Sequence, residues 1–335
     1  MIQQSIARLV EGQDLSRTEM AAVVAEIADG GATPAQVGAF LAALRLKGET
    51  VDEIAGAAEV MRARADRVRV DREVFVDTCG TGGDGQNTFN ISTTAAFAVA
   101  GAGVTVAKHG NRSVSSKCGS ADVLAALGVN VDARKEVVER CIAEVGIGFL
   151  FAPRLHPAFK AVAGLRRELA IRTVFNLLGP LANPAGARHQ VMGVYDARWV
   201  PVLGGVLNAL GSVHAFVVHG EGLDEIAVTG TTHVAEVKGG AVALYTLTPE
   251  ALGLSRWAAA DLAGGDAVHN ARVTCDVLAG QRGGPRDAVL ANAAAALVAA
   301  GAASDLRDGV RLAAEAIDRG AAREKLEGLA AASQA

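Results

Sequence analysis

The first 70 residues repeat one pattern, in which a polar helix start precedes apolar residues at helical spacing. The capping-box pattern, which opens a helix with two reciprocal hydrogen bonds, occurs at three pairs: Ser16 and Glu19, Thr33 and Gln36, and Thr50 and Glu53. Between the second and third of these starts, Val37, Phe40, Leu41 and Leu44 form one apolar face. Gly30-Gly31 and Gly48 supply stop signals. We therefore predict a helical domain over residues 1–70.

From Asp71 onward, short apolar runs alternate with helical stretches, which is typical of a largely parallel α/β sheet. Strands are predicted over residues 74–76, 104–107, 148–151, 191–194 and 215–218. Residues 233–237 and 242–247 alternate apolar and polar side chains on either side of Gly239-Gly240, which predicts an antiparallel pair. The fold class predicted is α/β: a small helical domain plus a larger α/β domain, residues 71–335, with a mostly parallel central sheet.

Residues 153–184 interrupt that alternation. A helix is predicted around residues 158–169, followed by two turns that contain proline, at Gly179-Pro180 and Asn183-Pro184. By itself the sequence shows only a break in periodicity here.

Composition narrows the class of protein. The chain has 335 residues, half of them apolar, and a net charge of −4. This length has room for two cores, and the charge favours neither nucleic acid nor a membrane surface as a partner. The longest apolar tracts, 95–107 and 290–303, are too short to span a bilayer. Polar residues interrupt the N-terminus and the four cysteines show no CxxC pairing, so we expect a cytoplasmic protein with free thiols.

The densest glycine cluster, Gly80-Thr81-Gly82-Gly83-Asp84-Gly85, follows the first predicted strand. Glycines are used where a ligand must approach the backbone amides. Asn90-Ile91-Ser92-Thr93 then opens an Ala-rich run typical of a buried helix, whose start attracts phosphate. A dinucleotide site would need an acid about 20 residues further on, and a Walker A loop would need Gly-Lys-Ser/Thr; neither is present. The pattern predicts an anion cradle that contains an aspartate.

Cations and acids follow later strands. Lys108-His109-Gly110-Asn111-Arg112 follows the second predicted strand and leads into a hydroxyl-rich run, Ser113, Ser115, Ser116 and Ser120. Asp224-Glu225 follows the strand at 215–218. Two adjacent carboxylates at a strand exit suit Mg²⁺, although an acidic pair on a loop is by itself usually solvated surface. Open α/β sheets bind ligands at these strand ends.

Several motifs together carry a family resemblance. Gly-Thr-Gly-Gly-Asp-Gly, Asn-x-Ser-Thr, Lys-His-Gly-Asn-Arg and Gly-Ser-Ala-Asp occur in this order between residues 80 and 122. Segments 165–169, 173–184 and 222–225 continue the series. Over nearly its full length the chain resembles the anthranilate phosphoribosyltransferases, of the nucleoside phosphorylase and phosphoribosyltransferase-like superfamily. One departure is Ala170, where glycine is usual in that family.

The resemblance implies a reaction and its residues. The phosphoribosyl group of 5-phosphoribosyl 1-pyrophosphate (the donor) would pass to anthranilate (the acceptor) with release of pyrophosphate, in tryptophan biosynthesis. The residues implied for the donor are Gly80, Gly83, Asp84, Thr88, Asn90, Ile91, Ser92, Thr93, Lys108 and Ser120. Those implied for anthranilate are Gly80, Asn111 and Arg166, and those for Mg²⁺ are Ser92, Asp224 and Glu225. The resemblance also implies a homodimer. Within each chain it implies that roughly residues 155–187 join the helical domain, which forms one wall of a hinged cleft.

Plainer interpretations of single residues stay open. Arg166 could form a surface ion pair, and Asn111 could only hold a turn. His109 is assigned a structural role, because a histidine beside a glycine is more often structural. No residue is assigned as an acid or base, because the amine of anthranilate is unprotonated near neutral pH. The apolar side chains of Ile6, Leu9 and the face around Phe40 could form a dimer interface or ordinary core.

Three rival functions are weighed against this one. A pyrimidine nucleoside phosphorylase shares the resembled fold, but it would not be expected to carry Asp224-Glu225 or the 80–85 pattern in this form. An NAD-dependent oxidoreductase lacks its ribose-binding acid here. A non-catalytic relative that binds nucleic acid would need a broad basic face, against which the net charge of −4 argues.

Overall fold

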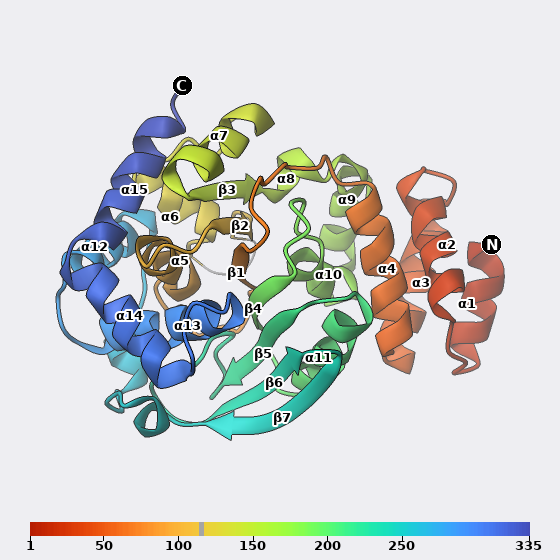
Figure 1. The fold of residues 1–335 in the computed structure, drawn as a ribbon. Helices are drawn as coiled ribbons and strands as arrows, with labels where there is room; N and C mark the ends of the chain where they lie inside the picture. Colours follow the sequence, from red (N-terminus) through yellow and green to blue (C-terminus); the bar gives the residue numbers. More distant parts are fainter. Residues whose placement is uncertain (114–116) are drawn as a thin grey trace.

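The computed structural model describes residues 1–113 and 117–335, so Ser115 and Ser116 of the hydroxyl-rich run lie outside the described residues. The chain begins with four helices packed together (Figure 1): α1 (Ile2–Val10), α2 (Arg17–Ala28), α3 (Pro34–Lys47) and α4 (Val51–Ala63). The three predicted capping boxes are all present, at Ser16, Thr33 and Thr50. Leu9 and Phe40 are buried between the helices, so that face is core.

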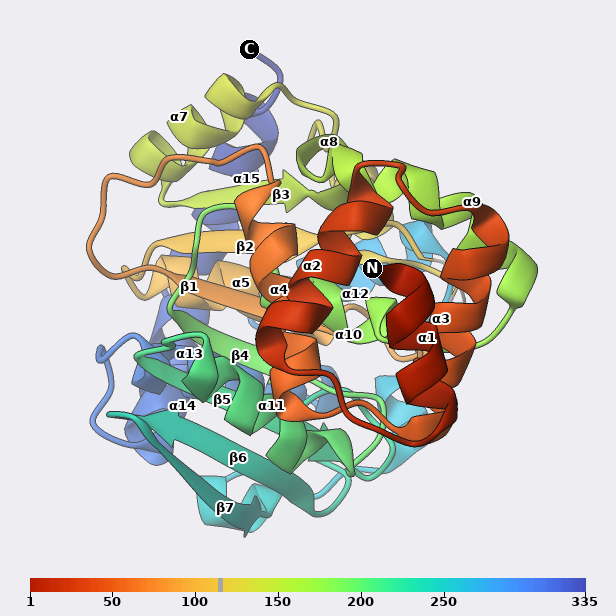
Figure 2. The ribbon, with the colours of Figure 1, turned by 90° about the vertical axis from the view of Figure 1, so that its right-hand side faces the viewer.

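A seven-stranded sheet forms the centre of the molecule, in the order β3-β2-β1-β4-β5-β6-β7 (Figure 2). Its strands are β1 (Val76–Gly80), β2 (Val106–Gly110), β3 (Ile147–Phe151), β4 (His189–Gly193), β5 (His214–Gly220), β6 (Thr232–Lys238) and β7 (Ala241–Leu247). Strands β1 to β5 are parallel, and β6 and β7 add the predicted antiparallel hairpin at one edge. The prediction of a mostly parallel sheet is confirmed.

The two faces of the sheet belong to two hydrophobic cores, because successive side chains of a strand point to opposite sides. Along β5, Phe216 and Val218 lie in one core, and Ala215 and Val217 lie in the other. The first core also contains α5 (Ile91–Gly101) and α13 (Gly284–Ala299). The second contains α10 (Phe175–Leu181) and α11 (Trp199–Ala209) and continues into the four N-terminal helices.

The remaining helices surround these cores. They are α6 (Ser120–Ala126), α7 (Lys135–Val145), α8 (Ala152–Leu155), α9 (Lys160–Leu169), α12 (Ala267–Leu278), α14 (Leu306–Asp318) and α15 (Ala321–Ala332), with short 3-10 turns at Pro157–Phe159, Pro249–Leu252 and Ala259–Leu262. Among the described residues, no helix is both long enough and apolar enough to cross a membrane.

The first two strands begin two residues later than their apolar residues predicted, and they end four and three residues later. Strand β1 therefore includes Asp77, and β2 includes Lys108 and His109. These polar groups are tolerated in the sheet because they bond to one another and to Asn183. One carboxylate oxygen of Asp77 accepts from the His109 N–H at 3.1 Å, and the other accepts from Asn183 Nδ2 at 2.8 Å. Hydrogen bonds between segments that are distant in the sequence thus allow both strands to continue past their apolar residues.

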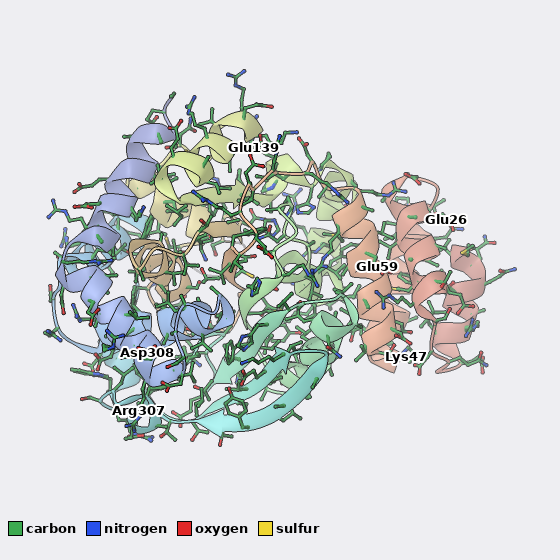
Figure 3. The ribbon with its side chains drawn as sticks, viewed as in Figure 1. Glu26, Lys47, Glu59, Glu139, Arg307 and Asp308 are labelled. Carbon is green, nitrogen blue, oxygen red and sulfur yellow. The ribbon has the colours of Figure 1, made fainter. Side chains whose placement is uncertain are left out.

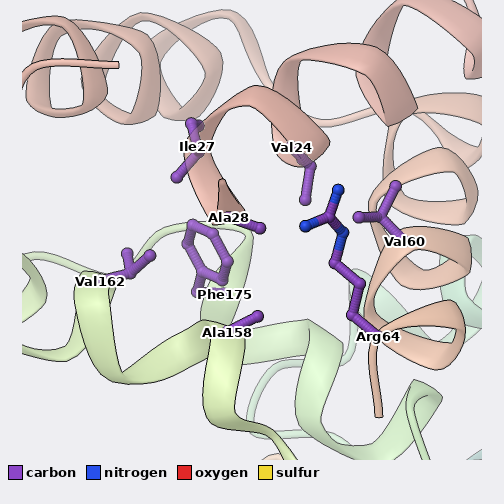
Figure 4. A pocket seen from close by; sticks show the side chains of 8 residues that line it. All are labelled: Val24, Ile27, Ala28, Val60, Arg64, Ala158, Val162 and Phe175. Carbon is purple, nitrogen blue, oxygen red and sulfur yellow. The ribbon is translucent and has the colours of Figure 1, made fainter. Parts of the chain in front are cut away.

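The segment from 153 to 184 packs against the N-terminal helices. Phe175 and Val162 share a core with Val24 and Ile27 of α2, and a small pocket between these elements is lined by Val24, Ile27, Ala28, Val60, Arg64, Ala158, Val162 and Phe175 (Figure 4). The predicted turn at Gly179-Pro180 is wrong, because both residues lie inside α10. Pro180 is buried there and its carbonyl accepts from Gln190 Nε2 at 2.7 Å, so tertiary contacts outweigh the turn signal.

Candidate active site

The glycine loop lies between β1 and α5, and its glycines answer two separate demands. Gly82, Gly83 and Gly85 have positive φ angles of 66°, 79° and 78°, which side chains rarely adopt. Gly80 is required for a different reason, because a Cβ atom there would lie 2.5 Å from Asp224 Oδ2. The missing side chains therefore let an acid from a distant loop reach the backbone of this one.

Asp224 and Glu225 each bind a different part of the predicted anion cradle. Asp224 Oδ2 accepts a hydrogen bond from the N–H of Gly82 at 2.8 Å, and Glu225 Oε1 accepts from the N–H of Ser92 at 3.0 Å. Asp84 approaches from the glycine loop, where its Oδ2 accepts from the N–H of Asp224 at 3.4 Å. The fold thus brings the acidic pair to the glycine loop and the start of α5, which lie more than a hundred residues earlier in the chain.

The convergence of acids has an electrostatic cost. Burial, with the nearby charge of Asp84, raises the pKa of Asp224 to about 7. Burial, with the charge of Asp224, raises the pKa of Glu225 to about 8. Like-charged carboxylates in a desolvated place resist ionisation together, and a cation would relieve that repulsion. Their oxygens, with the hydroxyl of Ser92 beside them, are the hard donors that Mg²⁺ prefers.

The described side chains offer such an ion only part of a coordination shell. Among the described residues there is no group of three or more His, Cys, Asp or Glu side chains placed to hold a metal. Magnesium commonly binds one or two carboxylates and completes its shell with water and substrate phosphates. The acidic pair fits this second type of site.

Lys108 supplies a cation behind the cradle. Its ammonium is buried and donates to the carbonyl of Thr78, and Thr78 in turn donates through Oγ1 to the carbonyl of Ser92 at 3.1 Å. Burial lowers the pKa of Lys108, while Asp77, Glu225 and Asp224 act in the opposite direction. The lysine is thus linked to the start of α5 and lies in the field of the same acids.

The other predicted donor residues lie around the start of α5. Asn90 precedes the helix without capping it; its Nδ2 donates to the carbonyl of Cys118 at 3.2 Å, and its Oδ1 accepts from Asn270 at 2.9 Å. Ile91 and Thr93 are almost fully buried, and the N–H of Ile91 donates to the carbonyl of Phe89 at 2.8 Å. Thr88 is half-buried in a bridge to Ala263, and Ser120 Oγ donates to the carbonyl of Asn111 at 3.1 Å.

The residues predicted to bind anthranilate lie in different surroundings. Asn111 Oδ1 accepts from the N–H of Arg112 at 2.7 Å, so its side chain does hold a turn. Arg166 is half-buried on α9; burial lowers its pKa, and no described acid offsets that effect. Its neighbour Arg167 is exposed. An arginine that is partly desolvated without an acidic partner is suited to a ligand carboxylate, and Arg166 forms no ion pair with the described residues.

His109 was set aside as structural, and its surroundings show more. Its Nδ1 lies 3.0 Å from the carbonyl of Gly179, while Nε2 is buried without a partner in the described structure. Burial, with the ring of His156 at 5.1 Å, lowers the pKa of His109 to about 3. The ring is therefore neutral, and if Nδ1 donates to Gly179 then Nε2 is an acceptor. The sequence signal was its place between Lys108 and Asn111.

Ala170, at the position where the resembled family usually has glycine, has a left-handed backbone conformation. Its φ is +49°, and its N–H donates to the carbonyl of Arg166 at 3.3 Å. The turn after α9 therefore places an alanine in a conformation that favours glycine.

Charged side chains elsewhere on the molecule mix both signs (Figure 3). Lys47 pairs with Glu53 at 3.0 Å, Glu59 with Arg17 at 2.5 Å, and Asp308 with Arg311 at 2.7 Å. The first pair is buried and joins α3 to α4, the second joins α2 to α4, and the third lies within α14. This distribution offers no support for a surface that binds nucleic acid.

Comparison with known proteins covers nearly the whole chain. Residues 3–65 match the family described as "Glycosyl transferase family, helical bundle domain", and residues 72–323 match "Glycosyl transferase family, a/b domain". An anthranilate phosphoribosyltransferase from Anaeromyxobacter dehalogenans is 79% identical over 333 residues, which is 99% of each chain.

Solved structures agree with this. The crystal structure of anthranilate phosphoribosyltransferase from Thermus thermophilus has a TM-score of 0.94 at 44% identity and covers 99% of both chains. The Saccharomyces cerevisiae anthranilate phosphoribosyltransferase in complex with PRPP and Mg has a TM-score of 0.89 at 29% identity, covering 99% of this chain and 98% of that one. Since identity and fold both extend from end to end, the chain belongs to the anthranilate phosphoribosyltransferase family.

Proposed function

We propose that this protein transfers the phosphoribosyl group of 5-phosphoribosyl 1-pyrophosphate to anthranilate in tryptophan biosynthesis. The products are N-(5-phosphoribosyl)anthranilate and pyrophosphate. The observation that carries the proposal is the meeting of Asp224 and Glu225 with the backbone N–H groups of Gly82 and Ser92. Oxygen ligands for a divalent cation and donors for an anion converge there, as a pyrophosphate leaving group requires.

In the reaction, the bond from ribose carbon 1 to pyrophosphate breaks and a bond from that carbon to the anthranilate nitrogen forms, with loss of a proton from nitrogen. Positive charge develops on the sugar while negative charge moves to the leaving oxygens. Groups that neutralise those oxygens more strongly in the transition state accelerate the step. We assign this role to the backbone from Gly80 to Gly85, to the start of α5 at Asn90–Thr93, and to Lys108, with Thr88 and Ser120 as hydroxyl donors.

Ser92, Asp224 and Glu225 would hold Mg²⁺. The raised pKa values of Asp224 and Glu225 support this assignment, because both carboxylates need a cation to be ionised together near neutral pH. When bound, Mg²⁺ supplies positive charge to the pyrophosphate oxygens. In its absence the hydrogen bonds from Gly82 and Ser92 keep the carboxylates at the cradle.

Anthranilate needs a partner for its carboxylate and one for its amine. Arg166 fits the carboxylate, and we also assign Gly80 and Asn111 to anthranilate. His109 Nε2 fits an N–H donor, because it is a buried acceptor without a described partner. Holding the nitrogen in line with carbon 1 is a large part of the catalysis expected here.

The organisation of the protein completes the proposal. We assign two domains, residues 1–70 joined by roughly 155–187, and residues 71–335. Phe175 and Val162 support the joining, because they pack with α2. We further propose that the protein is cytoplasmic and forms a homodimer. The exposed apolar side chains of Val10 on α1 and Leu46 on α3 support the dimer.

The test is product formation from anthranilate, donor and Mg²⁺. The reaction is monitored through the loss of anthranilate fluorescence and the release of pyrophosphate. Gly83→Val should abolish product formation, because it places a branched side chain where the backbone amides approach the phosphate oxygens of the donor. Gly30→Val is the matched control, since Gly30 has a similar φ of 72° but lies in the helical domain. Pyrophosphate release that does not depend on anthranilate would contradict the proposal, and cleavage of a pyrimidine nucleoside by phosphate would favour the phosphorylase.

A further inference from the structure

Arg172 touches the glycine loop from outside the predicted site. It lies between α9 and α10, and its Nη2 donates a hydrogen bond to the carbonyl of Gly83. The guanidinium carbon also lies 3.9 Å from the centre of the Tyr195 ring, a cation–π contact at the end of β4. The arginine thus joins the segment that carries Arg166 to the loop that would bind the donor.

The glycine loop is also held by the end of β4 and by the loop that carries Asp224. The N–H of Thr81 donates to the carbonyl of Gly193 at 2.9 Å, and the N–H of Gly82 donates to Asp224 at 2.8 Å. The carbonyl of a later peptide, between Gly83 and Asp84, accepts from Arg172 Nη2. A peptide after a glycine with φ of 79° can rotate easily, because no side chain opposes the turn.

The direction of that peptide matters for an anion. A peptide unit is planar and trans, so its C=O and its N–H point in opposite directions. While Arg172 holds the Gly83 carbonyl on its own side, the N–H of Asp84 is turned the other way. If the peptide flipped, a carbonyl oxygen would face the cradle and repel the donor's phosphates.

The partner of Arg172 is itself fixed. Tyr195 donates its N–H to Thr81 Oγ1 at 3.1 Å, and its hydroxyl accepts from Trp199 Nε1 at 2.9 Å. The ring is therefore a rigid platform attached to the start of the same loop. A planar guanidinium can lie on this platform and still donate to the carbonyl, which a lysine ammonium does less well.

We propose that Arg172 is a positioning residue that holds the Gly83–Asp84 peptide with its carbonyl turned away from the donor, using Tyr195 as its platform. The proposal rests on the proposed function, since it assumes that the glycine loop binds the donor's phosphates. Arg172 need not touch either substrate. Its effect is on donor affinity through the loop.

The experiment compares steady-state kinetics of Arg172→Ala, Arg172→Lys and the exposed control Arg167→Ala. Losing a charged hydrogen bond at an exposed site should raise the donor KM about tenfold in Arg172→Ala. The acceptor KM and the melting temperature should stay near the wild-type values. Arg172→Lys should recover part of the loss, and Arg167→Ala should match wild type.

Two further readouts separate positioning from general damage. Guanidinium chloride at millimolar concentration should restore the donor affinity of Arg172→Ala. Sodium chloride at the same ionic strength should not restore it. If Arg172→Ala does not fold, Tyr195→Leu should raise the donor KM while Tyr195→Phe, which keeps the ring, should not. A donor KM within twofold of wild type in Arg172→Ala or in Tyr195→Leu overturns the proposal. A wild-type protein that forms no product would instead overturn the proposed function.

Discussion

Gly80→Ala is the smallest change that should disturb the meeting of the acids with the glycine loop. The new Cβ would lie 2.5 Å from Asp224 Oδ2, whereas an ordinary contact begins at 3.4 Å. The carboxylate must therefore move by about 0.9 Å. Its hydrogen bond from the Gly82 N–H, now 2.8 Å, would then stretch beyond the normal range.

The expected cost follows from that lost bond. A hydrogen bond to a charged group contributes about 1.5 to 3 kcal/mol, so donor affinity in the presence of Mg²⁺ should fall by about ten- to a hundredfold. Calorimetric titration with 5-phosphoribosyl 1-pyrophosphate measures this directly. Gly38→Ala is the control, because its Cβ would meet only Leu169 Cδ2 at 3.8 Å. Donor affinity within twofold of wild type in Gly80→Ala would refute the idea that the position of Asp224 governs donor binding.

Three other changes probe the acceptor, the turn and a buried histidine. Arg166→Ala should raise the anthranilate KM by about ten- to a hundredfold while leaving the donor KM nearly unchanged, and Arg167→Ala should behave as wild type; exchanged behaviour would move the site by one residue. Ala170→Gly should stabilise the fold by about 0.5 to 1 kcal/mol in urea unfolding, because the steric strain that alanine has in the left-handed conformation exceeds the extra chain entropy of glycine. As the control, Ala143→Gly on α7 should destabilise the fold by about 1 kcal/mol. The pKa of His109 is lowered to about 3, so the unfolded chain binds one more proton below about pH 6.5 and stability falls as the pH drops. Between pH 7.5 and 5.5 this should cost wild type about 1.4 kcal/mol more than it costs His109→Asn, and equal losses would show that the ring is charged or exposed.

Local signals predicted the parts of the fold that depend on neighbours in sequence. The capping boxes at Ser16, Thr33 and Thr50 formed as predicted because their partners are three residues away. The ends of β1 and β2 were misplaced because Asp77 is satisfied by Asn183, more than a hundred residues later. Periodicity carries no information about such a bond.

The site divides in the same way. The glycine loop was visible from its own residues, but Asp224 and Glu225 read as solvated surface until the family resemblance placed them opposite it. Arg172 was missed because its contact with Gly83 is purely tertiary. His109 was set aside because only burial in the folded chain lowers its pKa and leaves Nε2 without a described partner.

The central claim is that the acidic pair binds the donor through Mg²⁺, and a thermal melt tests it most directly. Wild type should be stabilised by 5-phosphoribosyl 1-pyrophosphate only when Mg²⁺ is present, by roughly 2.7 kcal/mol at a hundredfold excess over Kd, or several degrees in Tm. The Asp224→Asn, Glu225→Gln double variant should fold and should lose this stabilisation. Equal stabilisation of the double variant, or of wild type without a divalent cation, would contradict the account.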